Sequence, residues 1–247
     1  MKQDITVTGM ILSAAPAGEY DRRLIILTKE LGKITAFAKG ARRQNNALLA
    51  KTNPFSFGKF TMTPGRNTYH MKNAEIDHYF REITDDYEKT CCGFYFLELA
   101  AYYTKEADDE LQMLKLLYQS LRALLNTSIP VKLVRYIFEL KILVINGEYP
   151  RMFQCIRCGA EVKSGYFFVK ESGIICEACT QGLQEGIWMP EAALYTMQYV
   201  ITSPIEKLYT FVVSEDVLEI ISKVMDVYRQ HYIEKHFKTL DVLVQCP

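Results

Sequence analysis

The chain has 247 residues, of which 49% are hydrophobic, so a substantial core can form in one large domain or in two to three smaller ones. Basic and acidic residues balance at 29 each, which leaves a formal net charge of zero. No apolar run approaches the roughly 20 residues that a membrane-spanning helix needs, so the sequence argues against a helical membrane protein.

The first 80 residues are predicted to form β structure. Five short runs have the alternation or the β-branched and aromatic content of strands, and turn residues separate them: residues 5–11, 21–28, 32–39, 55–62 and 67–77. Five short strands joined by glycine-containing turns favour a small closed barrel, for which the OB-fold is the natural five-stranded choice. A generic five-stranded barrel or an SH3-like barrel is the alternative, because strand number alone leaves the topology open.

Basic residues are concentrated in this N-terminal region. Between Arg22 and Lys72 there are eleven Lys or Arg residues and one acidic residue, Glu30, so this stretch carries +10 in a neutral chain. Such asymmetry indicates a surface for nucleic acid or another polyanion, and a solvated basic face is the simpler alternative. The polar run 40–46 is predicted to be an exposed loop that offers Arg42 and Arg43 to phosphates or stacked bases.

From about residue 85 the hydrophobic period becomes helical. Helices are predicted over residues 87–102, 109–125, 130–146, 191–201 and 214–237. Their leucine and aromatic stripes are assigned to the core, together with the thiols of Cys91 and Cys92. The apolar tail 238–247 is expected to pack back on the body or to meet a partner.

Two CxxC pairs interrupt the helical region. Cys155 and Cys158 form the first pair, Cys176 and Cys179 form the second, and the residues between them predict a β-hairpin. Two such turns aim four thiolates at one point, which is the shell of structural Zn²⁺ in a zinc ribbon. Disulfides or redox-active pairs are the alternatives. Because the sequence opens directly into a strand-like run without a signal peptide, we expect a reducing compartment, where metal binding is favoured.

The motifs of catalysis are not found. Four cysteines fill the coordination shell of a zinc ion and leave no position for a reactive water, and no histidine belongs to the HxE motif of a zinc deaminase. The sequence also has no P-loop, GxSxG or HExxH motif. No catalytic residue and no enzymatic activity are therefore predicted.

Three passages of the sequence resemble one known family. They are the N-terminal runs 9–12, 21–24, 28–33 and 38–43, the run 138–147 before the first cysteine pair, and the two cysteine pairs themselves. In this order, over nearly the full length of the chain, they resemble the RecO family of recombination mediators. The predicted fold class is α+β, with an N-terminal five-stranded OB-fold β-barrel (1–80), an α-helical domain (81–148 and 181–247) and a four-cysteine zinc ribbon inserted in it (149–180).

The resemblance implies a bacterial, cytoplasmic protein of DNA repair that associates with the nucleoid when on DNA. Members of the family bind single- and double-stranded DNA, anneal complementary strands and work with RecR. They also recognise the C-terminal tail of single-stranded-DNA-binding protein and help to load the recombinase RecA. The complete cysteine quartet places this chain with the zinc-bearing members. The alternative function is a zinc-ribbon scaffold for protein interactions that lacks annealing activity.

Candidate contacts follow from this function. We expect the DNA phosphates to be bound by a set of six basic residues: Arg22, Arg23, Lys33, Lys39, Arg42 and Arg43. Second choices are Lys51, Lys59 and Arg66. Phe37 and Tyr69 are candidates for base stacking, although barrel aromatics more often belong to the core. Lys132 and Arg135, with Tyr136 or Phe138 nearby, are candidates for holding the acidic, apolar-ended tail, and a solvated helix face is the alternative.

Overall fold

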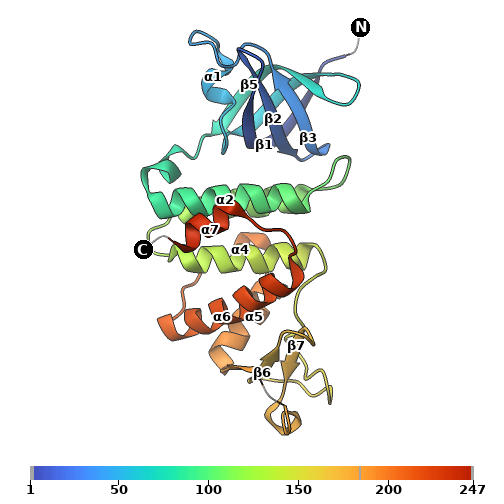
Figure 1. Cartoon of the computed structure of the whole chain (residues 1–247), viewed down its shortest axis with the longest axis vertical. Helices are drawn as coiled ribbons and strands as arrows, with labels where there is room; N and C mark the ends of the chain where they lie inside the picture. Colours follow the sequence, from blue (N-terminus) through green and yellow to red (C-terminus); the bar gives the residue numbers. More distant parts are fainter. Residues whose placement is uncertain (1–2, 184, 246–247) are drawn as a thin grey trace. The chain divides into compact units, whose positions relative to one another are not determined.

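Five strands near the N-terminus close into a barrel in the computed structural model, which describes residues 3–183 and 185–245 (Figure 1). The strands are β1 (Ile5–Ala17), β2 (Asp21–Thr28), β3 (Gly32–Ala38), β4 (Phe57–Pro64) and β5 (Tyr69–His78). Their order is β1-β2-β3-β5-β4, and β1 pairs with β4 to close the barrel. Only β3 and β5 pair in parallel among these strands. This order is that of the OB-fold, so the predicted barrel is confirmed.

The closing seam of the barrel depends on two glycines. Gly9 of β1 and Gly58 of β4 are register partners. A Cβ atom built on Gly9 would lie 2.3 Å from the carbonyl oxygen of Leu27, and one built on Gly58 would lie 2.1 Å from that of Glu75. Neither position has room for a side chain, so the close approach of the neighbouring strands requires glycine at both.

Side-chain alternation fills the barrel interior. Leu24 and Ile26 of β2 and Phe60 of β4 are fully buried and belong to one apolar cluster with residues of every other strand. The residues between them on each strand face outward, which leaves the outer surface of β2, β3 and β5 available for polar and aromatic side chains.

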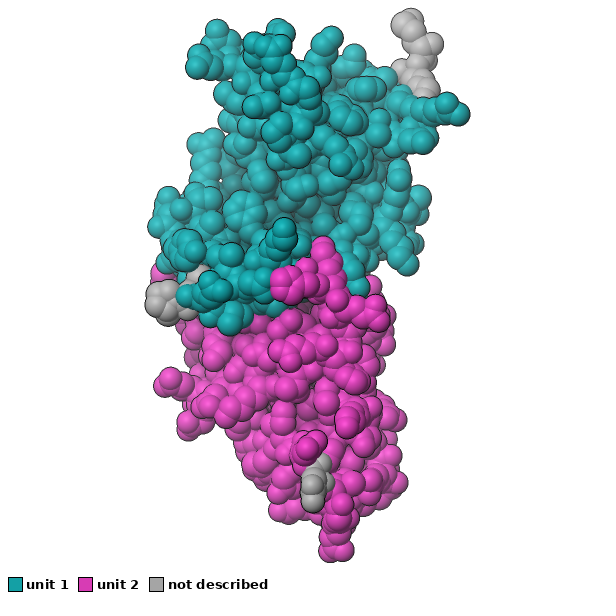
Figure 2. Space-filling model, in the orientation of Figure 1, with its two compact units in different colours: residues 1–125, 237–247 teal, residues 126–236 magenta. Residues whose placement is uncertain are grey.

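Helices complete the first of two compact units, which comprises residues 1–125 and 237–247 (Figure 2). These elements are α1 (Leu48–Lys51), the 3₁₀ helix η1 (Arg81–Asp85), α2 (Tyr87–Tyr103), α3 (Leu111–Leu124) and α7 (Lys238–Val244). The C-terminal tail packs back on the body, which is one of the two arrangements expected from sequence, because α7 lies against α2. The ring of Phe237 lies 5.7 Å, between centroids, from those of Tyr95 and Tyr102 and anchors it.

The second unit, residues 126–236, is built around α4 (Val131–Ile145). All residues from Leu133 to Leu143 are buried, and α5 (Glu191–Thr202) and α6 (Glu215–Tyr232) both pack against this helix. A small antiparallel sheet of order β7-β6-β8 adjoins them: β6 (Gly165–Phe168), β7 (Gly173–Ile175) and β8 (Ile187–Met189). Two short 3₁₀ helices, η2 (Glu177–Cys179) and η3 (Ile205–Lys207), complete the unit.

The structure differs from the sequence prediction at the end of the last long helix and at β8. The last helix was expected to continue to residue 237, but α6 ends at Tyr232 and Ile233 is extended. Helical periodicity does not show that Phe237 packs against Tyr95 and Tyr102 instead of continuing the helix. The strand β8 was not predicted, because three residues carry too little pattern to be distinguished from the approach to α5.

The first compact unit contains α2 and α3 as well as the barrel. The domain borders expected from sequence, after residues 80, 148 and 180, remain predictions. Within residues 3–183 and 185–245, no helix combines the length and the apolar character needed to cross a bilayer.

Candidate nucleic-acid interface and metal centre

A row of three side chains crosses the outer face of the barrel. Arg23 on β2 is the register partner of Phe37 on β3, which in turn is the partner of His70 on β5. Arg23 and His70 are exposed and Phe37 is half-buried. The Arg23–Phe37–His70 row thus presents a cation, a flat ring and an imidazole together, which suits phosphate contact and base stacking. Sequence analysis missed His70, because only the strand register places it beside Phe37.

Arg42 and Arg43 are exposed in the connection between β3 and α1. This connection is tied to the β1–β2 turn, since the Arg42 backbone N–H donates to the carbonyl of Tyr20 at 2.9 Å and its guanidinium donates to that of Glu19 at 3.1 Å. The Arg43 guanidinium lies over the Tyr20 ring, 4.8 Å from the centroid. The guanidiniums of two consecutive residues are therefore both held by contacts within the protein. This arrangement suits binding to successive phosphates.

Arg22 is engaged within the protein. Its Nη1 atom donates to the carbonyl of Leu49 at 2.9 Å, to Oγ1 of Thr52 at 2.8 Å and to Oδ1 of Asn53 at 2.9 Å. Burial, followed by the charge of Arg42, lowers the pKa of Arg22. These contacts fasten the C-terminal end of α1 to β2, so Arg22 fits a positioning role better than a direct phosphate contact.

Lys33 is also engaged within the first unit. Its Nζ atom donates to the carbonyl of Ala101 on α2 at 2.5 Å, and its backbone N–H donates to that of Lys105 at 2.8 Å. The side chain therefore ties the β2–β3 hairpin to the end of α2. Lys39, by contrast, is exposed.

The other sequence candidates fall into different environments. Tyr69 packs against the barrel core, whereas Phe37 does not belong to that cluster. Lys59 is exposed on β4, and its register partner on β5 is the acidic residue Glu75. Lys51 is half-buried on α1, and Arg66 is exposed in the β4–β5 turn. Phe37 and Arg66 thus remain the stronger candidates among these residues.

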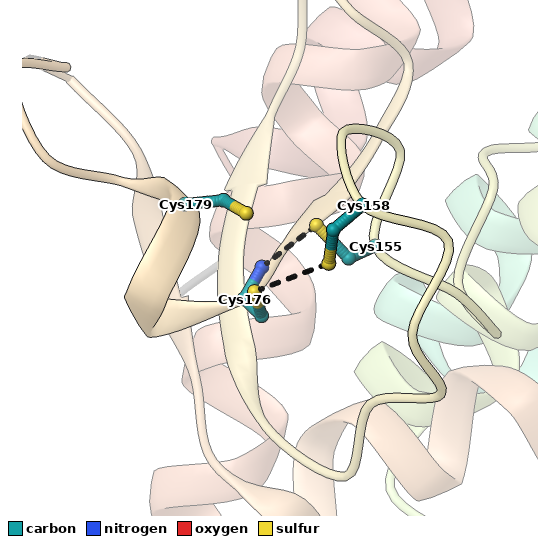
Figure 3. Close-up of side chains that lie close together, drawn as sticks. All are labelled: Cys155, Cys158, Cys176 and Cys179. Atoms are coloured by element: carbon teal, nitrogen blue, oxygen red, sulfur yellow. Dashed lines mark hydrogen bonds between the residues drawn. The ribbon is translucent and has the colours of Figure 1, made fainter.

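The four cysteines converge at one point (Figure 3). Their sulfur atoms all lie within 4.8 Å of one another, and those of Cys158 and Cys176 are 3.8 Å apart. Cys155 and Cys158 come from the turn before the small sheet, and Cys176 and Cys179 come from the end of β7 and η2. The sequence-predicted clustering of these four side chains is confirmed, and the cluster is able to hold a metal ion.

Backbone N–H groups surround the sulfur of Cys155, and that of Cys176 lies 3.4 Å from it. Burial would raise the pKa of Cys155, but hydrogen bonds from the N–H groups of Cys176, Cys158 and Arg157 outweigh it and lower the pKa to about 6. Hydrogen bonds shared with the thiols of Cys176 and Cys158 raise the pKa of Cys179 to about 12. A tetrahedron with metal–sulfur bonds of about 2.3 Å has edges of about 3.8 Å, which the closest pair already matches. The donor set therefore fits a tetrahedral thiolate-bound ion.

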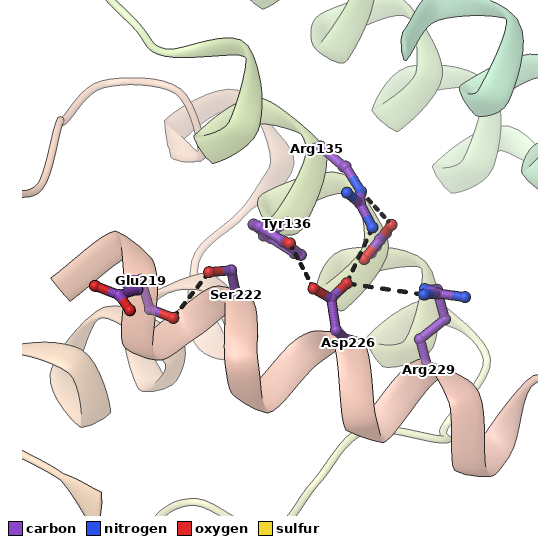
Figure 4. Close-up of polar contacts among 7 residues, drawn as sticks. Arg135, Tyr136, Glu219, Ser222, Asp226 and Arg229 are labelled. Carbon is purple, nitrogen blue, oxygen red and sulfur yellow. Dashed lines mark hydrogen bonds and ion pairs between the residues drawn. The ribbon is translucent and has the colours of Figure 1, made fainter. Parts of the chain in front are cut away.

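The two partner-binding candidates on α4 differ in accessibility. Lys132 is exposed, but Arg135 is buried, and its guanidinium donates to Glu139 at 2.9 Å and to Asp226 on α6 at 3.1 Å (Figure 4). The hydroxyl of Tyr136 donates to the same Asp226 carboxylate at 3.0 Å. Burial alone would lower the pKa of Arg135, but the charges of Glu139 and Asp226 outweigh it and raise that pKa. Arg135 thus joins α4 to α6, and Lys132 is the accessible cation of the pair.

The chain combines an OB barrel that has basic loops with a cluster of four cysteines that is able to hold a metal ion. It therefore belongs to the class of OB-fold proteins that carry a thiolate metal site. Comparison with known proteins identifies the family within this class. The family model described as Recombination protein O N terminal matches residues 1–80, and that described as Recombination protein O C terminal matches residues 84–241.

Relatives named DNA repair protein RecO match nearly the whole chain. The protein of Acetivibrio thermocellus is 30% identical over 241 residues, which are 97% of this chain and 96% of that protein. The protein of Alkaliphilus metalliredigens is 29% identical over 96% of this chain and 98% of its own length, and that of Clostridium novyi is 26% identical over 94% and 91%. The chain therefore belongs to the RecO family, whose role lies in DNA repair and recombination.

Proposed function

We propose that this chain is a recombination mediator that binds single- and double-stranded DNA, anneals complementary strands and helps to load recombinase onto DNA. The observation that carries the proposal is the outer face of the OB barrel, where the Arg23–Phe37–His70 row crosses β2, β3 and β5. The connections between the barrel strands expose further arginines. Membership of the RecO family supports the same function.

Annealing requires no bond-breaking step. It requires two phosphate backbones to be neutralised while their bases stay free to pair, and each phosphate contact releases condensed counterions. We assign the phosphate contacts to five exposed residues that form no ion pair within the described part of the chain: Arg23, Lys39, Arg42, Arg43 and Arg66. Arg22 and Lys33, the other two sequence candidates, position α1 and the β2–β3 hairpin.

The metal of the four-cysteine cluster is proposed to be one structural Zn²⁺. Zn²⁺ favours four thiolates in a closed tetrahedron, and the cluster supplies four and no other ligand type. When bound, the ion links the turn at Cys155 to the end of β7. We assign it no catalytic step, and we propose no enzymatic activity for the chain.

The proposed partners follow from the family. They are RecR, the acidic C-terminal tail of single-stranded-DNA-binding protein and, indirectly, RecA, in the bacterial cytoplasm and at the nucleoid. An acidic tail with an apolar end needs a cation beside an apolar surface. Lys132 meets the first requirement, because it is exposed on α4, whereas the charge of Arg135 is already compensated by two carboxylates.

The experiment that tests this function is strand annealing without nucleotide. Two labelled complementary oligonucleotides are mixed with the purified full chain across a salt series. The proposal predicts accelerated annealing at low salt that fades steeply as salt rises. No acceleration by folded, metal-loaded protein would favour the scaffold function instead.

A further inference from the structure

An extended segment before the first cysteine pair exposes every second side chain. Tyr149, Arg151 and Phe153 are exposed, while Pro150 and Met152 between them are buried. Tyr149 and Phe153 each keep 41% of their surface in contact with solvent, so both rings are accessible to a ligand. At about 3.3 Å per residue, the two rings are separated by about 13 Å of backbone with the cation midway.

The backbone of this aromatic–cation–aromatic segment is held rigidly. The N–H of Arg151 donates to the carbonyl of Ser172 at 2.9 Å, and its own carbonyl accepts from the N–H of Ile174 at 3.0 Å. The carbonyl of Met152 accepts from the side chain of Gln198 on α5 at 2.7 Å. The exposed side chains thus project from a fixed strand-like edge, so little ordering is required when a ligand binds.

These side chains border a hollow of about 400 Å³, which is within the size range of ligand pockets. Tyr149, Arg151 and Phe153 line it together with Ile156 and Gly159. Gly159 has φ of +73°, and among the described residues no atom beyond its sequence neighbours lies within 4 Å of the position its Cβ would take, so that position faces open space.

We propose that the Tyr149–Arg151–Phe153 segment is a second single-strand site, which captures the bases of a DNA strand by stacking. The proposal rests on the annealing function, because annealing needs two strands held at once. Exposed aromatic rings flanking an arginine form the stacking platform by which proteins bind single strands without sequence preference. The Arg151 guanidinium donates to the carbonyl of Glu171 at 3.0 Å, and within residues 3–183 and 185–245 no carboxylate forms an ion pair with it.

Charge distinguishes this site from the barrel. Residues 149–180 contain four Lys or Arg and three Glu, and four thiolates on a divalent ion add two negative charges. The segment therefore attracts phosphates weakly, and stacking must supply most of its affinity. With Arg151 as the one phosphate contact, the log–log salt slope of this site should be about −0.7, from ~0.7 per phosphate on single strands.

The test counts short strands on the full, zinc-loaded chain. Eight-nucleotide oligothymidylate is titrated into wild-type protein, Y149A/F153A, Y149F/F153Y and R42A/R43A, and bound strands per chain are counted by native mass spectrometry at rising salt. We expect two strands on the wild type and on Y149F/F153Y, and one on Y149A/F153A. The strand that R42A/R43A retains should be the one that salt displaces least. Annealing by Y149A/F153A should slow at least fivefold with its metal content and melting temperature unchanged.

Two results separate this inference from the function on which it rests. If Y149A/F153A binds two strands and anneals like the wild type, the second site is refuted, the annealing function stands, and the hollow is left for a protein segment. If the wild type anneals strands but never binds more than one strand per chain at any salt, the second site is likewise refuted. Wild-type protein that neither binds nor anneals DNA would overturn both.

Discussion

The amine of Lys141 on α4 lies 2.7 Å from the carbonyl oxygen of Ser203, just beyond the end of α5. The same Nζ atom donates to the carbonyls of Val200 at 3.1 Å and Ile201 at 3.0 Å. The last carbonyls of a helix have no partner within the helix, and a cation is favoured beside them. Lys141 therefore caps α5 from a neighbouring helix, although burial lowers the pKa of its amine.

Replacing Lys141 by methionine should destabilise the protein by about 2–3 kcal/mol, because three buried carbonyls lose their donor while the apolar stem is kept. Chemical denaturation measures this change. Lys132→Met, on the exposed face of the same helix, is the matched control and should change stability by less than about 0.5 kcal/mol. Equal effects of the two substitutions would contradict the capping role.

Tyr228 should make stability depend on alkaline pH. Its hydroxyl donates to the carbonyl of Glu148 at 2.7 Å and accepts from Ser172, and burial raises its pKa to about 12. The folded protein therefore keeps this proton where the unfolded chain, with a pKa near 10, loses it. Stability from this group is complete below pH 10 and is lost as pH rises toward 12, by about 2–3 kcal/mol at ~1.4 kcal/mol per pKa unit.

Tyr228→Phe is the variant that isolates this effect. It should be less stable than the wild type at neutral pH, by about 1 kcal/mol for the lost hydrogen bond, and it should show a shallower decline of stability between pH 10 and 12. Parallel stability curves for the two proteins across that range would show that Tyr228 does not retain its proton in the folded state.

Arg22 and Arg23 are neighbours on β2 with different predicted roles. Arg22→Ala should lower the free energy of unfolding by about 1–3 kcal/mol, because it removes three hydrogen bonds to the α1 region. Arg23→Ala should leave stability within about 0.5 kcal/mol and should weaken binding to all DNA sequences alike, since phosphates carry no sequence code. Thermal unfolding and oligonucleotide binding, measured on both variants, would contradict this division if the two behaved identically.

Removing one metal ligand should unfold the region around β6 and β7 first. Cys155→Ser is expected to lose the bound zinc and to lower the melting temperature, because one thiolate of a four-ligand shell is gone. Metal content by atomic emission and calorimetry provide the measurement, and Cys91→Ser, at a buried thiol outside the cluster, should retain one zinc per chain. A metal-free Cys155→Ser protein of full stability would show that the site contributes nothing to folding.

Much of the architecture could be predicted from the residues. The β-branched and apolar content of 21–28 and 32–39, bounded by turn residues, identifies two barrel strands. The CxxC spacing identifies the cysteine cluster because few arrangements satisfy it. The end of α6 could not be predicted, since it depends on where Phe237 finds its partners Tyr95 and Tyr102.

The binding residues were harder to predict for the same reason. Composition locates the basic residues but does not show which of them already form hydrogen bonds or ion pairs within the protein. Arg22, Lys33 and Arg135 look like free cations in the sequence, yet each donates hydrogen bonds to specific oxygens of its own unit. The register between strands that are distant in sequence decides which exposed side chains become neighbours, as it does for His70 and Phe37.

The central claim is that exposed basic residues of the barrel neutralise DNA phosphates, and the salt dependence of single-strand binding tests it most directly. Five phosphate contacts predict a log–log slope of about −3.5 for the barrel, at ~0.7 per phosphate, and R42A/R43A should reduce it to about −2.1. Weaker binding with that shallower slope would support the claim. An unchanged slope in a folded R42A/R43A variant would contradict it.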